Sequence, residues 1–281
     1  MKPFYWIIFM VCVSAVSCTT MKLSIPSDFS DQATKMKVKG VNGWPVNEHA
    51  SFGNYKTTRI KRGWHSVSGR RKGDFFELNA EESMLRILGV TKNEVRTTEK
   101  DKFHFEIQHD SLSAEVYALE RKVSNSTKIV TTRNDILKNL DLINYDNNRE
   151  YKFAAMILPS TSPVDQPWSL VMSRYYDKRN DTARRLFDRP YEEEKGYVTN
   201  GIDSIFIKPI YVQKAESKSG KEGKMPWKIV SGYELRWDGG ISCVVDAFGK
   251  YVWMYNELEP SEKLLLAAIS TAILLRRIED K

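Results

Sequence analysis

Hydrophobic and polar residues alternate most clearly near the end of the chain. Over residues 233–237, aromatic and aliphatic side chains alternate with charged ones, which is the two-residue period of a half-buried β-strand. The next three residues, Asp-Gly-Gly, tolerate the positive φ angles of a tight turn. Two more alternating segments follow at 241–245 and 251–255, with a second turn between them. The pattern predicts a three-stranded antiparallel meander.

Further strands are predicted in the middle of the chain. Apolar residues alternate with polar ones over 103–108, and again over 112–118 after a turn at Asp110-Ser111. Pro209 places its own strand at a sheet edge or a bulge, because proline has no amide hydrogen to donate. The other strand candidates are 55–64, 151–158, 169–176 and 205–212, and the Lys-, Ser- and Gly-rich segment 213–224 is predicted as a mobile hairpin loop.

Two short helices are predicted as connections packed on the sheet. Residues 79–88 begin with an asparagine that can cap a helix and are followed by Gly89, which favours a helix end. Residues 134–143 place their aliphatic side chains on one face.

The last helix is different, because residues 264–275 are apolar on every face. Such a helix must be buried all round. At about 1.5 Å per residue it covers roughly 18 Å, well short of the ~30 Å of a bilayer core. The sequence therefore predicts a core helix over 261–278.

These elements together predict a mainly β fold. We expect an antiparallel barrel or strongly curved sheet wrapped around the hydrophobic C-terminal helix, with a β-sandwich plugged by the helix as the alternative. The meander over 232–255 and the helix over 261–278 resemble the Tubby C-terminal-like group. That resemblance implies a closed antiparallel barrel around a hydrophobic helix, and some members of the group bind phosphoinositides. It is a match of arrangement, so no individual residue is carried over.

Composition narrows the class of protein. A chain of 281 residues with 41% hydrophobic and 28% charged residues is typical of globular proteins, and it excludes a disordered chain or a polytopic membrane protein. The net charge of +7 is too small to indicate a nucleic-acid partner by itself.

The N-terminus has the layout of a secretory signal. Lys2 is followed by an uncharged stretch from Phe4 to Val16 and then by Ser17-Cys18. The segment 15–18, Ala-Val-Ser-Cys, resembles the lipobox of bacterial lipoproteins, although alanine stands where leucine is usual. An ordinary cleaved signal and a retained anchor are the alternatives. We predict a signal peptide over 1–17, a polar tether over 18–35 and a single domain over 36–281.

The lipoprotein resemblance implies a location in the Gram-negative cell envelope. Cys18 would carry the lipid, and the three acyl chains of such an anchor, palmitate among them, give stable membrane attachment. Thr19 follows the cysteine where an aspartate would signal retention in the inner membrane, and no acidic run follows. The expectation is an outer-membrane lipoprotein on the periplasmic face.

Candidate catalytic chemistry is sparse. Cys243 lies in an apolar strand and is predicted to be a buried small hydrophobe. His104 and His109 point to opposite faces of one strand, whereas His104 and Glu106 share a face. The acidic run 192–194 is predicted as a solvated turn. We predict no metal site, no cofactor and no catalytic residue.

The most unusual local feature is positive. No acidic residue lies between Glu48 and Asp74, while basic and aromatic residues interleave there, which suits an anionic lipid or glycan. The plainer interpretation is a solvated edge strand. A second basic stretch over 174–189 is interleaved with acidic residues. The candidate anionic-ligand residues are Lys56, Arg59, Lys61, Arg62, Trp64, Arg70, Arg71 and Lys72.

The leading hypothesis is an outer-membrane-anchored lipoprotein that serves as a non-catalytic binding or structural module of the envelope. One rival is a hydrolase of an envelope polymer that uses His104 and Glu106, so catalysis stays open, with a non-enzyme favoured. Another rival is a subunit of an envelope assembly complex, whose protein partner the sequence does not identify.

Overall fold

The computed structural model describes residues 25–41, 48–72, 90–131, 143–160, 166–180, 193–216 and 222–278. The predicted signal peptide, Cys18 and the helix expected over 79–88 lie outside the described residues. So does the helix expected over 134–143, except for its last residue, which begins a strand.

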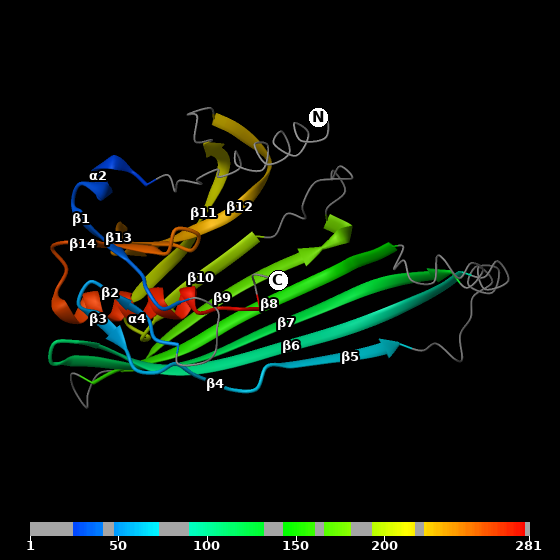
Figure 1. Ribbon diagram of the computed structural model, residues 1–281, viewed down its shortest axis with the longest axis horizontal. Helices are drawn as coiled ribbons and strands as arrows, with labels where there is room; N and C mark the ends of the chain where they lie inside the picture. The colour runs from blue at the N-terminus through cyan, green and yellow to red at the C-terminus, as the bar shows by residue number, and fades with distance from the viewer. Residues whose placement is uncertain are drawn as a thin grey trace, which may run out of the picture.

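The described residues form one antiparallel sheet with a helix on its inner side (Figure 1). Nine consecutive strands, β6 to β14, each pair with the next one along the chain. The mainly β prediction is confirmed, and the sandwich alternative is wrong because a single sheet surrounds the helix. These strands are β6 (Val90–His109), β7 (Leu112–Thr131), β8 (Ile143–Pro159), β9 (Trp168–Asp177), β10 (Glu193–Thr199), β11 (Ser204–Glu216), β12 (Glu222–Trp237), β13 (Gly240–Asp246) and β14 (Tyr251–Tyr255).

Short N-terminal strands complete the two ends of the sheet. One end is β1 (Ala33–Lys37), which pairs with β14. At the other end, several short strands pair with β6 at different positions along its length. A β-bridge between Lys39 and Ser51 brings the two ends of the sheet together, so the barrel is nearly closed. The strands that line this end are β2 (Ser51–Phe52), β3 (Tyr55–Thr57), β4 (Lys61–Arg62) and β5 (Ser66–Lys72).

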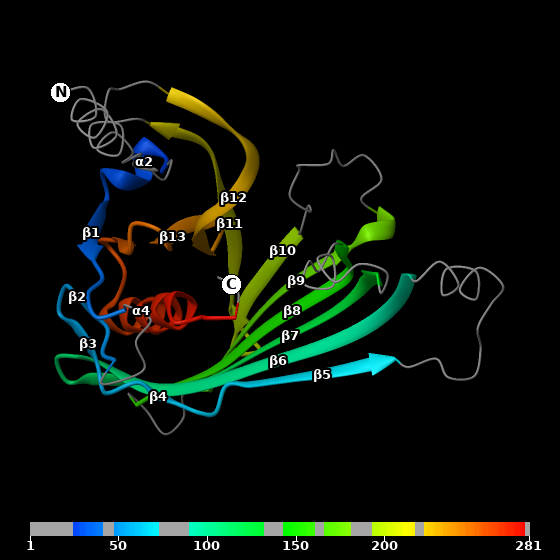
Figure 2. The same cartoon turned by 45° about the vertical axis from the view of Figure 1, so that its right-hand side comes forward.

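The helix α4 (Pro260–Leu274) is the core element that the sequence predicts. Pro260 stands in its first turn, and Glu259 and Glu262 form a capping box that satisfies amide hydrogens there. Residues 264–273 are all buried, with β6–β8 packed on one side of the helix and β13–β14 on the other. The long strands β6–β8 continue past the C-terminal end of α4 and flare outward (Figure 2).

The segment before β1 belongs to the folded unit. The short helix α2 (Ser27–Ser30) places Phe29 on the outer surface of the sheet, where it packs with Val244 and Trp253. β1 then pairs with β14 over its whole length. The prediction of a tether through residue 35 is therefore wrong for residues 25–35, because Phe29 finds an apolar site that the sequence pattern does not reveal.

The predicted hairpins are confirmed. Asp110 and Asp238 both adopt positive φ angles at the tips of their hairpins. Pro209 lies beyond the part of β11 that pairs with β10, and the β11–β12 register shifts just after it, so its predicted edge position is also confirmed. The hairpin predicted over 213–224 exists, but Glu216 already pairs with Glu222, so its strands are longer than expected.

Candidate functional site: an apolar groove bordered by basic side chains

The predicted anionic-ligand residues do not converge on one point. Lys56 pairs with Gln108 near the tip of β6, whereas Lys72 pairs with Glu94 near its start. At about 3.3 Å per residue, the two positions are roughly 46 Å apart along the strand. The segment forms a stripe along the edge of the sheet, and no single small ligand can contact all of it.

The alternation of side chains further divides this set. Lys56, Lys61 and Arg70 pair with Gln108, His104 and Arg96, which lie on the outward face of β6. Arg62 pairs with Phe103, which is buried in the core, so its side chain points inward.

Arg62 belongs to a buried ionic cluster. Its Nε donates to Glu48 at 2.9 Å, its Nη2 donates to the carbonyl oxygen of Leu275 at 2.9 Å, and Asp101 lies 3.5 Å from Nη1. Only 7% of the Arg62 side chain is exposed. Arg62 therefore has a structural role that the sequence does not reveal, since its guanidinium ties the C-terminal end of α4 to the sheet, and it also lines the groove described below.

The other predicted residues are placed as follows. Arg59 is exposed, and Trp64 is 93% exposed in the connection between β4 and β5. The backbone of Arg71 and Lys72 belongs to β5, and their side chains lie outside what the structure describes.

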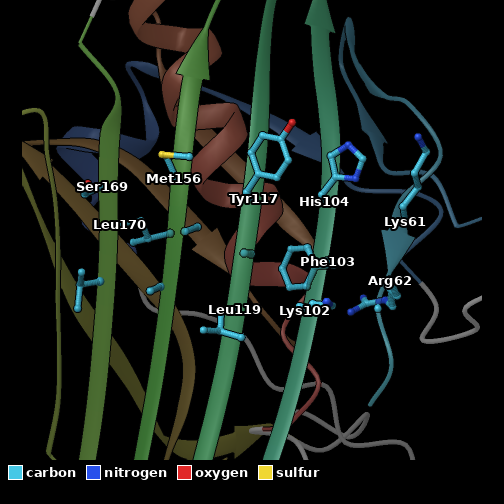
Figure 3. Close-up of a pocket in the computed structure, with 15 residues that line it drawn as sticks. Lys61, Arg62, Lys102, Phe103, His104, Tyr117, Leu119, Met156, Ser169 and Leu170 are labelled. Carbon is cyan, nitrogen blue, oxygen red and sulfur yellow. The ribbon is translucent and has the colours of Figure 1, made fainter. Parts of the chain in front are cut away.

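A groove of about 670 Å³ crosses the outer face of β4 and β6–β9 (Figure 3). The labelled Lys61, Lys102, His104, Tyr117, Leu119 and Met156 project from the face opposite α4, which lies behind the strands in this view, whereas Arg62, Phe103 and Leu170 also border the groove from positions that face the core. One row of the groove is in cross-strand register and consists of Lys61, His104, Tyr117, Met156 and Ser169. The imidazole of His104 stacks on the Tyr117 ring, with the ring centres 5.0 Å apart.

The neighbouring row is more apolar. Lys102 pairs with Leu119, and the row continues through Ala154 to Val171. Half of the Leu119 side chain is exposed, although its neighbours in this row are aliphatic. On the next two strands Tyr197 and Phe206 extend the same row, and both are exposed. An apolar strip that faces solvent over several strands marks a binding surface.

A basic row borders this apolar strip. Lys100 pairs with Arg121, Arg121 pairs with Lys152, and the row continues to Lys195 on β10. All of these side chains are exposed on the outward face. Lys152 forms an ion pair with Glu150 at 2.6 Å. Like charges directly opposite one another in a sheet repel, so a bound anion would stabilise this row.

The sequence contains a signal for the groove that the hairpin prediction does not use. The apolar positions 112–118 point inward, as predicted, and this leaves Tyr117 and Leu119 on the outward face. Two large hydrophobic residues at outward positions of one strand are the sequence feature that indicates the apolar strip.

No family model, curated protein or solved structure matches the chain significantly. Within the described residues, no helix has the length and apolar character needed to cross a membrane.

The candidate catalytic and metal-binding groups are separated. His104 lies in the groove, whereas His109 stacks on the ring of Tyr55. No group of three or more His, Cys, Asp or Glu residues that could hold a metal ion occurs in the part of the chain that the structure describes. Cys243 is fully buried, as predicted, and burial raises the pKa of its thiol to about 12. Such a thiol is no nucleophile at neutral pH.

The acidic run is not a solvated turn where the structure describes it. Residues 193 and 194 belong to β10, and Glu194 is buried beside Arg276 at 3.0 Å. Arg276 also donates to the hydroxyl of Tyr233 at 2.5 Å. The prediction of a solvated turn is wrong here, because a buried arginine after α4 supplies the partner that this carboxylate needs.

Proposed function

We propose that this protein is a non-catalytic envelope module that binds an anionic lipid in the groove on the outer face of β4 and β6–β9. The observation that carries the proposal is the apolar strip that runs directly beside a row of basic side chains. An acyl chain would lie along Leu119, Met156 and Val171, and an acidic headgroup would meet Lys102, Arg121 and their basic neighbours.

The dimensions and chemistry of the groove favour a lipid over a glycan. A volume of about 670 Å³ lies within the usual range for sites of small ligands, about 300–1,000 Å³. Its floor is mainly aliphatic, whereas binding of a glycan needs polar partners for many hydroxyl groups. The resemblance of the C-terminal part to Tubby-like proteins, some of which bind phosphoinositides, supports the same choice.

The proposal includes anchoring to the outer membrane through Cys18, with the domain on the periplasmic face. The support for it is the lipobox-like segment 15–18 and Thr19 after it. In the background of Lys102→Glu with Arg121→Glu, which weakens binding through the groove, replacing Cys18 by alanine is expected to move the protein from the membrane fraction to the soluble fraction of the envelope. Continued membrane attachment of that triple variant would refute the anchor, whereas attachment of Cys18→Ala that is lost only with the charge reversals would support the groove.

Vesicle binding tests the groove. Protein lacking residues 1–18 is mixed with sedimenting vesicles of phosphatidylcholine alone or with phosphatidylglycerol added. We expect binding only to the anionic vesicles. Each basic residue near an anionic surface contributes about 1 kcal/mol, so Lys102→Glu with Arg121→Glu should weaken binding by about thirtyfold or more. Lys39→Glu, an exposed lysine where the two ends of the sheet meet, is the matched control.

The apolar strip needs its own variant. Leu119→Asn should weaken vesicle binding, whereas Phe248→Asn, at an exposed aromatic residue in the turn between β13 and β14, should not. Binding that responds to the charge reversals and ignores Leu119→Asn would show that the protein contacts only the lipid headgroups, and it would refute an acyl chain in the apolar strip. Equal binding by all variants would refute the groove as the site.

A further inference from the structure

The strand β5 pairs along one side only in the part of the chain that the structure describes. Its residues Ser66 to Lys72 pair with residues in the first half of β6, and no other described strand pairs with β5. At the narrow end of the barrel the sheet is closed by the bridge between Lys39 and Ser51, whereas β5 lies along the flared end (Figure 2). Its second edge presents amide and carbonyl groups that can accept another strand.

Two large hydrophobic residues lie beside this edge. Trp64, just before β5, is 93% exposed, and Val67 within β5 is 61% exposed. Tryptophan is enriched among the residues that contribute most to binding at protein interfaces. A fully exposed tryptophan next to an open strand edge is therefore suited to a protein partner.

The charge along the edge specifies the partner further. Arg70 is exposed and pairs with Arg96, which is also exposed, so two like charges lie directly opposite each other. Arg71 and Lys72 follow in the sequence. An acidic strand alongside β5 would relieve this repulsion, whereas a second copy of β5 would add to it.

We infer that the free edge of β5 is a strand-addition site for an acidic, extended segment of a partner protein. The segment would lie antiparallel or parallel to Ser66–Lys72 and form main-chain hydrogen bonds with it. Trp64 and Val67 would cover apolar side chains of the partner, and Arg70 would pair with its carboxylates. Affinity in this mode comes from the main-chain bonds and specificity from the side chains.

The test uses the mature full-length chain and a labelled peptide of alternating Glu and Val residues, with the Lys-Val peptide as the charge control. We expect the acidic peptide to bind and the basic one not to bind. Trp64→Ala should weaken binding by about tenfold or more, as should Arg70→Glu. Phe248→Ala and Lys39→Glu, which alter an exposed aromatic residue and an exposed lysine elsewhere, should bind as the wild type does.

Backbone measurements identify the binding mode. Amide hydrogens of successive strand residues point to opposite sides, so bound peptide should slow exchange at alternate residues of 66–72. For the same reason, one of the two variants Ser68→Pro and Gly69→Pro removes a main-chain hydrogen bond to β6. The other variant removes only an amide hydrogen that points to the free edge of β5. The variant that keeps the stability of the wild type should lose peptide binding.

Several results would overturn this inference. They are failure of the acidic peptide to bind, binding that Trp64→Ala and Arg70→Glu leave unchanged, and slowed exchange only outside residues 66–72. Vesicle binding is measured on Trp64→Ala in parallel. Its retention separates the strand edge from the lipid groove, so either proposal can fail while the other stands.

Discussion

The Nε atom of Arg62 lies 2.9 Å from the Oε2 atom of Glu48, and both side chains are shielded from solvent. Arg277 reaches the same carboxylate oxygen at 3.1 Å, and Asp101 faces Arg62 from β6. These residues come from distant parts of the chain, and together they hold the segment after α4 against the sheet. The cluster closes the core of the barrel where the helix ends.

Removing Arg62 should destabilise the protein strongly. In Arg62→Met, Asp101 loses its arginine partner and Glu48 keeps only Arg277. Breaking a buried ion pair from one side costs about 3–5 kcal/mol, because it leaves uncompensated buried charge. Urea denaturation followed by circular dichroism measures the free energy of unfolding.

The matched control is Arg59→Met, at an exposed arginine three positions earlier in the chain. A surface substitution of this kind changes the free energy of unfolding by about 0.5 kcal/mol or less. If the two variants had equal stabilities, the buried cluster would have no structural role.

Glu120 gives the stability a specific pH dependence. Its carboxylate is fully buried and accepts hydrogen bonds from the amides of Arg277 and Ile278 and from the hydroxyl of Tyr151. Burial raises the pKa of Glu120 above the ordinary value of a glutamate, about 4.5, because desolvation outweighs these bonds. The folded protein therefore binds this proton more tightly than the unfolded chain.

The direction of the effect follows from linkage. The stabilisation from the bound proton is complete below about pH 4.5 and is lost as the pH rises toward the raised pKa, by up to about 1.4 kcal/mol per pH unit. Glu120→Gln cannot titrate, so the unfolding free energy of the wild type should fall relative to that of the variant over this interval. Denaturation of both proteins from pH 4 to 8 tests this. Parallel pH profiles would contradict it.

The sequence supports the prediction of some elements much better than others. The helix α4 and the meander β12–β14 are predictable because an all-apolar helix and a two-residue period have few other structural solutions. Arg62 is not predictable from its neighbours in sequence, since its inward direction depends on its register with Phe103. The position of Phe29 depends in the same way on contacts with Val244 and Trp253 from the far end of the chain.

The groove, like Arg62 and Phe29, is not predictable from neighbouring residues in the sequence. The strands β7, β8 and β9 each contribute only one or two outward hydrophobic residues, and a single exposed hydrophobic residue is common on protein surfaces. The apolar strip exists because the register of the three strands β7, β8 and β9 aligns Leu119 with Ala154 and Val171. Sequence reasoning can detect the outward residues of one strand, but the alignment between strands requires the structure.

Leucine-to-alanine substitutions should distinguish the contribution of the core to the free energy of unfolding from that of the groove. Leu266 is fully buried in α4, so Leu266→Ala should lower the free energy of unfolding by about 2–5 kcal/mol. Leu119 is half exposed in the groove, and Leu119→Ala should cost less than about 1 kcal/mol. Denaturation measures both, and a larger loss for Leu119→Ala would mean that the groove is part of the folding core.

Cys243 should report on the opening of the barrel. Its thiol is fully buried with Sγ 3.4 Å from the hydroxyl of Ser270 on α4, and burial raises its pKa to about 12. Only a thiolate attacks a disulfide reagent, so the native protein should resist labelling at neutral pH. With Cys12 and Cys18 replaced by serine, labelling by an aromatic disulfide reagent should follow the unfolding transition in urea. Rapid labelling without denaturant would show that the sheet and α4 separate around Cys243 in the native state.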